Sequence, residues 1–109
     1  MTFEELLSEV NKIKCEEKRG ETPDYLEVVV GKAEWGKLTD ILSSYWGQAF
    51  KPEGASPSRE ADLYSKDFGG IQKNQTMYFR KNGNGCELAL VWPWGSGNSL
   101  TAKLIRKSS

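Results

Sequence analysis

The side chains able to carry out acid–base, nucleophilic or metal chemistry are few in this chain, and their types set the first limits on its function. No histidine occurs among the 109 residues, and the only thiols belong to Cys15 and Cys86. Without histidine the chain cannot assemble a Ser-His-Asp or Cys-His arrangement, or a metal site with histidine ligands. Because two cysteines cannot complete a structural zinc site either, we expect no metal and no cofactor.

Three other features could support catalysis, and each has a simpler interpretation. The glutamates near the N-terminus fall on the polar side of a predicted helix, and nothing in the sequence suggests the burial that an acid–base catalyst needs. Cys86 could be activated by Lys81 across a hairpin, but a half-buried strand residue is the simpler interpretation. The segment Gly95-Ser96-Gly97 lacks the remaining residues of a phosphate-binding loop. We therefore expect that the protein is not an enzyme.

The aromatic residues give the strongest positive signal. Four tryptophans among 109 residues is a high number, and two of them flank a proline in Trp92-Pro93-Trp94. Trp35, Trp46 and Trp92 fall on apolar stripes and are expected in the core. Trp94 lies in a glycine-rich turn, where it either folds back over the edge of the core or stands exposed as a binding anchor.

An open sheet face is the second candidate surface. Strand alternation indicates that Tyr78, Arg80 and Lys103 share one face, and aromatic and basic residues on a sheet can bind single-stranded nucleic acid. From residue 69 onward six lysines and arginines stand against one acid, Glu87, so this part carries a net charge of +5. The first 68 residues carry −5, which indicates either a polarised molecule or simply acidic helices and basic strands.

Helical periodicity indicates two main helices and a shorter one. The first begins at a capping box formed by Thr2 and Glu5, and Gly20 is its expected stop. The second spans about residues 33–46, where apolar and aromatic side chains cover one broad stripe. Residues 56–67 favour a short third helix, in a segment whose order the sequence leaves open.

Period-two alternation predicts four strands. The first covers residues 25–30 and contains three consecutive valines. The other three form an antiparallel meander over residues 76–81, 86–92 and 99–107, and Asn82-Gly83-Asn84-Gly85 makes a strong hairpin turn between the first two. The last strand could form an edge of the sheet, which would allow self-association.

These elements predict a single α+β domain over residues 1–109, in the order α-β-α-(α)-β-β-β. An antiparallel or mixed sheet of about four strands would carry two to three helices on one face, and the position of the first strand is open. The longest apolar runs are three or four residues, and the N-terminus lacks the features of a signal peptide. We therefore expect a soluble, cytoplasmic protein without membrane association.

The favoured function is that of a small binding or accessory module, which contacts a protein partner through Trp94 and the basic sheet face. The alternative is nucleic-acid binding through Tyr78, Arg80 and Lys103, and a small enzyme without histidine ranks third. Neither the identity of the partner nor the oligomeric state follows from the sequence.

Overall fold

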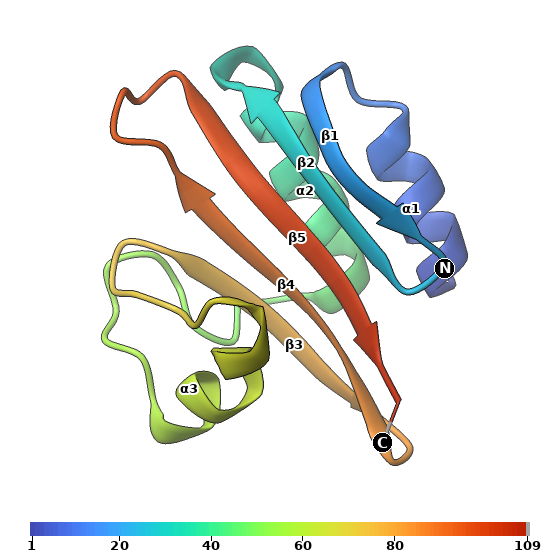
Figure 1. Cartoon of the computed structure of the whole chain (residues 1–109), viewed down its shortest axis with the longest axis vertical. Coiled ribbons are helices and arrows are strands. Elements are labelled where there is room, and N and C mark those ends of the chain that lie inside the picture. The colour runs from blue at the N-terminus through green and yellow to red at the C-terminus, as the bar shows by residue number, and fades with distance from the viewer. Residues whose placement is uncertain (109) are drawn as a thin grey trace.

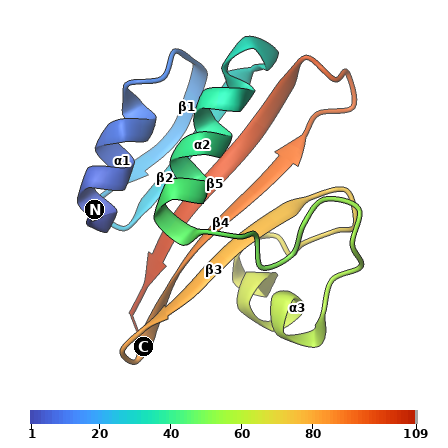
Figure 2. The ribbon, with the colours of Figure 1, turned by 180° about the vertical axis from the view of Figure 1, so that it is seen from behind.

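The computed structural model describes residues 1–108 and shows a five-stranded antiparallel sheet with helices on both faces (Figures 1 and 2). The sheet order is β1-β2-β5-β4-β3. The α+β class is therefore confirmed. In chain order the elements are α1 (Phe3–Asn11), β1 (Cys15–Thr22), β2 (Tyr25–Gly31), α2 (Trp35–Trp46), α3 (Arg59–Ser65), β3 (Thr76–Asn82), β4 (Gly85–Pro93) and β5 (Ser99–Lys107), with 3-10 turns at Lys32–Glu34 and Lys66–Phe68.

Helices α1 and α2 lie side by side on one face of the sheet and bury the larger of two apolar cores (Figure 2). The capping box of α1 is present: the Thr2 N–H donates to Glu5, and the Glu5 N–H donates to the Thr2 hydroxyl. The apolar stripes of both helices then meet the inward side chains of β2, β4 and β5. The most deeply buried members of this core are Leu6, Val10, Leu26, Val28, Val30, Leu38, Leu42, Ala89, Ala102 and Leu104.

The second face of the sheet is covered only in part, by α3 and the chain around it. Ala61 of α3 packs on a smaller core that contains Met77, Leu88, Leu90 and Ile105. Strand β4 is apolar on both sides, so it needs cover on both sides, and this is why the short third helix lies opposite the other two. The prediction that the helices share one face thus holds for α1 and α2. In Figure 1, which looks onto the second face, β1, β2 and the adjoining part of β5 have no helix in front of them.

Residues 15–22 are a strand and not the end of the first helix, which stops at Asn11 instead of the expected Gly20. Edge strands in natural sheets are kept charged, so β1 shows no apolar alternation that could reveal it. A two-residue turn, in which the Asp24 N–H donates to the Thr22 hydroxyl, then joins β1 to β2. The sheet therefore has five strands, one more than expected.

Strand β5 lies at the centre of the sheet, which corrects the expectation that it could be an edge. It pairs with β2 from Tyr25↔Ile105 to Gly31↔Ser99 and with β4 from Cys86↔Lys107 to Pro93↔Leu100. The same pairing places the first predicted strand, β2, beside the last. The backbone groups of β5 are thus satisfied on both sides, and the sheet edges are β1 and β3.

The segment between α2 and β3 contacts the β3 edge through Lys51. The main chain of Lys51 exchanges two hydrogen bonds with Met77, and its ammonium donates to the carbonyls of Lys73 and Gln75. Burial lowers the pKa of this lysine. The contact covers part of an edge strand that would otherwise present unpaired backbone groups. Within residues 1–108 no helix has the length and apolar character needed to span a bilayer.

Candidate functional site

The three residues expected on one basic sheet face do not share a face. Tyr78 pairs with Ala89, which belongs to the core beneath α1 and α2, and Arg80 follows Tyr78 on that side. Lys103 pairs with Leu90, whose side chain belongs to the opposite core. The alternation within each strand is as predicted, but the register between strands decides which residues share a face. The surface on which nucleic-acid binding depended is therefore absent from this arrangement.

Tyr78 and Arg80 are occupied by contacts within the protein. The Tyr78 ring is buried and lies beside the Trp46 ring, with 5.9 Å between the centroids. The Arg80 guanidinium lies 4.4 Å from the centroid of the Tyr45 ring and donates to Glu87 at 2.8 Å. The buried Tyr78 ring therefore offers no free surface on which a base could stack.

Glu87 is a buried carboxylate that was not among the candidate residues predicted from the sequence. Its side chain accepts hydrogen bonds from the Tyr45 hydroxyl, from Arg80 and, at 3.1 Å, from Asn82. Its main-chain carbonyl accepts a further bond from the Trp46 indole at 3.3 Å. The available signal was a lone acid in an apolar strand, directly across a hairpin from an arginine. These bonds join the end of α2 to the β3–β4 hairpin and give Glu87 a structural role.

Tyr45 gives the network a measurable dependence on pH. Burial and then the neighbouring Glu87 raise the pKa of Tyr45 to about 12. Between about pH 10 and that value the unfolded chain has lost this proton and the folded chain keeps it, so the free energy of unfolding must fall as pH rises. We expect urea unfolding to show this alkaline loss in the wild type and a smaller loss in Tyr45→Phe. Equal losses in the two proteins would contradict the assignment.

Two of the six cations of the basic C-terminal third pair with acids from the rest of the chain. Arg106 pairs with Glu4 and Asp24, and Lys107 pairs with Asp67 at 2.9 Å. Part of the charge asymmetry along the sequence thus reflects pairing between its two parts.

The uncovered half of the second sheet face carries the candidate site, and we call it the open face. Lys103 marks its boundary with the α3 region: its ammonium donates to the Phe68 carbonyl at 3.0 Å and lies 5.1 Å from the centroid of the Trp92 ring. Strand pairing and ring contacts assign nine residues to the open face: Glu17, Arg19, Tyr25, Glu27, Val29, Trp92, Trp94, Thr101 and Lys103.

Trp94 folds back over this face and remains exposed, so it combines the two alternatives left open by the sequence. Its indole N–H donates to the Thr101 hydroxyl at 2.8 Å, and its main-chain N–H donates to Ser99 at 2.8 Å. Gly97, with a φ of 76°, allows the turn to close. Despite these restraints 38% of the residue surface is exposed.

Arg19 is the second member of the site, and it lies in a strand and not in the predicted first helix. It lies in β1 where the register to β2 shifts between Lys18 and Gly20, and such a bulge re-aims the side chain. Its guanidinium lies 5.5 Å from the centroid of the Trp94 ring and pairs with Glu17. A cation beside an indole is a favourable contact, and it restricts the ring further.

Within the described residues no group of three or more cysteine, aspartate or glutamate side chains is arranged to hold a metal ion. Comparisons with protein-family models, with curated proteins and with solved structures find no match to this chain.

Proposed function

We propose that the protein is a binding module, which engages a protein partner through the open face with Trp94 as the anchor. One observation carries this proposal: the Trp94 indole is held by Thr101 and Arg19, and 38% of the residue surface is still exposed. Tryptophan and arginine are the residue types most enriched among the side chains that dominate protein interfaces. Here the two lie in contact on a surface that no helix of the described chain covers.

The restraint on Trp94 favours binding because a fixed side chain loses little entropy when a partner covers it. Ordering a mobile side chain at an interface costs roughly 0.5–1.5 kcal/mol. The hydrogen bond to Thr101 fixes the indole before any partner binds. The sheet beneath the indole is well packed, because Val29 and Thr101 are buried. A preordered aromatic group on a rigid sheet is what an interface anchor requires.

The charges of the open face suit a protein surface better than a polyanion. Arg19 is paired with Glu17, and Glu27 lies directly beside Lys103 on the neighbouring strand. Cations that are already paired release few counterions on binding, so they add little affinity for a phosphate backbone. The proposed interface should therefore depend on salt only weakly.

The test is a pull-down from host lysate with the wild type, Trp94→Ala and Leu63→Ala. Leu63 is the matched control because it is a large apolar residue on α3 with 55% of its surface exposed, away from the open face. We expect a protein that is retained by the wild type and by Leu63→Ala and lost with Trp94→Ala. For an anchor worth about 2 kcal/mol, the affinity measured with the purified partner falls by about thirtyfold.

Two outcomes would contradict the proposal. If Trp94→Ala retains the same proteins as the wild type, Trp94 is not the anchor. If the retained material disappears on nuclease treatment or is mainly nucleic acid, the partner is not a protein. Thermal unfolding of Trp94→Ala checks that the variant is folded.

A further inference from the structure

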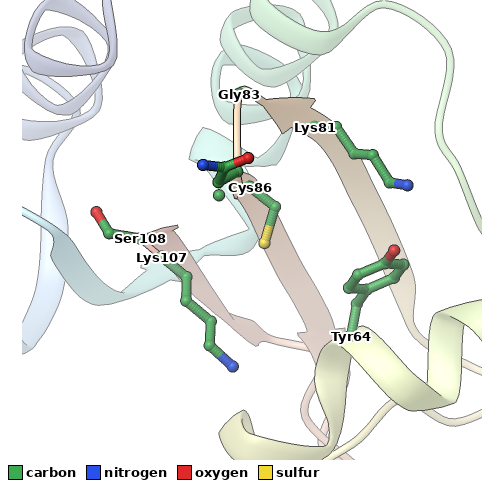
Figure 3. Close-up of a pocket in the computed structure, with 8 residues that line it drawn as sticks. Tyr64, Lys81, Gly83, Cys86, Lys107 and Ser108 are labelled. Carbon is green, nitrogen blue, oxygen red and sulfur yellow. The ribbon is translucent and has the colours of Figure 1, made fainter.

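A second site lies at the opposite end of the sheet from Trp94, where the β3–β4 hairpin meets the end of β5. A pocket of about 330 Å³ opens there between the hairpin, the last residues of β5 and Tyr64 of α3 (Figure 3). Sites for small molecules begin at about this volume. A hollow of about 240 Å³ adjoins it on the side of Asn82 and Arg106 and shares the wall formed by Cys86 and Lys107.

The charged residues that line these hollows are all cations. Lys81 and Lys107 line the larger pocket, Arg106 lines the smaller one, and no aspartate or glutamate of residues 1–108 contributes to either wall. Figure 3 shows Lys107 and Lys81 on either side of Cys86. Lys107 is partly compensated by Asp67, at 2.9 Å, and Arg106 by Glu4 and Asp24, whereas Lys81 has no ion pair within the described residues. The lining therefore favours an anion.

The wall between the two lysines is formed by less polar groups. Cys86 is a free thiol, 8% exposed, and in Figure 3 its sulfur points into the space between Tyr64 and Lys107. The Tyr64 ring stacks on Phe79 at 4.3 Å between centroids, which fixes its position in the wall. Gly83 and Gly85 of the hairpin add no side chain to the lining, and Asn84 and Ser108 add polar groups at its rim. This surface fits the carbon skeleton of a small ligand.

We propose that this pocket binds a small organic carboxylate, with the acid group attracted by the lysines that flank Cys86, Lys81 and Lys107, and the carbon skeleton against Cys86 and Tyr64. The pocket and the open face involve different residues and opposite ends of β5, so this site is independent of the protein-binding function proposed above.

Iodoacetate tests the proposal because it is itself a small carboxylate. Its binding in the pocket can be measured as alkylation of Cys86. The sulfur forms a bond to carbon, iodide leaves, and the thiol proton passes to solvent. In a Cys15→Ser background Cys86 is the only thiol, and its alkylation by iodoacetate is compared with alkylation by the neutral iodoacetamide. Burial slows both reagents, so the ratio of the two rates isolates the effect of the carboxylate. The reference is the ratio for the same protein unfolded in urea.

We expect the ratio of the iodoacetate rate to the iodoacetamide rate to be about fivefold higher in the folded protein than in the unfolded protein. Two partly exposed lysines would produce an increase of this size. Lys81→Gln and Lys107→Gln should each remove part of this increase. Lys73→Gln is the matched control, because Lys73 belongs to the same basic part of the chain and does not line the pocket; it should leave the ratio unchanged.

Three results would overturn the proposal. A folded ratio equal to the unfolded ratio would mean that Cys86 reacts only after the structure opens. An equal decrease in Lys73→Gln would mean that net charge, and not the pocket, attracts the reagent. No reaction with either reagent in the folded protein would mean that the pocket does not admit a molecule of this size.

Discussion

Replacement of Glu87 by alanine is expected to lower the free energy of unfolding by about 3 kcal/mol. The substitution leaves the buried Tyr45 hydroxyl and the Asn82 amide without their acceptor and removes the partner of Arg80. Each unsatisfied buried group costs about 1–3 kcal/mol. Arg80 has 47% of its side chain exposed and can bond to water instead, so it adds little to the expected loss of stability. Urea unfolding followed by circular dichroism measures the change.

Glu9→Ala is the control for this prediction. Glu9 also pairs with a cation, Lys12, at 3.3 Å, but both side chains are largely exposed. Exposed pairs contribute about 0–1 kcal/mol, so the free energy of unfolding should change by less than about 1 kcal/mol. Glu87→Gln should lie between the two variants, since it keeps one acceptor oxygen. If Glu87→Ala behaves like Glu9→Ala, the buried network does not stabilise the fold.

Gly85→Ala is expected to destabilise the protein by about 2–3 kcal/mol, although it adds a single methyl group. A Cβ at this position would lie 2.2 Å from the carbonyl oxygen of Lys107 and 3.2 Å from its carbonyl carbon. Both contacts are with main-chain atoms of β5, which pairs with β4 at this point, so neither can move without disturbing the ladder. Thermal unfolding of the variant should show a clearly lower midpoint.

Gly36→Ala is the matched control and should change stability in the opposite direction. Gly36 lies in the first turn of α2, and a Cβ there would meet no atom within 4 Å. Replacing glycine by alanine in an unstrained helical position stabilises by roughly 0.4–1 kcal/mol, mainly because the unfolded chain loses freedom. A loss of stability in both variants would indicate that the close approach at Gly85 is not the cause.

Local signals in the sequence predicted most of the elements, and the elements they missed lack such signals. The capping box at Thr2, the stripe of α2 and the glycine-rich turn at Asn82-Gly83-Asn84-Gly85 each depend on neighbours in the chain, and each predicted element is present. Strand β1 has charged residues on both faces, so its only support is the pairing with β2, which no pattern within residues 15–22 reveals. The prediction that the first helix continues to Gly20 is wrong for the same reason.

The sequence could indicate only those features of the candidate site that depend on a single residue and not on contacts between strands. The position of Trp94 in a glycine-rich turn left two alternatives, folding back over the edge of the core or exposure, and the structure combines them. Its contact with Arg19 was not predictable, because it requires β1 and the β4–β5 turn to meet. The grouping of Tyr78 with Lys103 failed because face sharing depends on the register of three strands, which Leu90↔Lys103 fixes.

The central position of β5 has a consequence for folding during synthesis. A ribosome makes α1, β1, β2 and α2 long before residues 99–107, yet β2 has β1 as its only neighbour until β5 arrives. The pairing Tyr25↔Ile105 closes a loop of most of the chain, and contacts of such sequence separation slow folding. Until β5 is made, the sheet beneath the helices lacks its central strand. The apolar side chains of Leu26, Val28 and Val30 are therefore only partly covered. The nascent chain thus passes through a stage with exposed apolar surface and an unpaired β2 edge, the kind of species that chaperones bind.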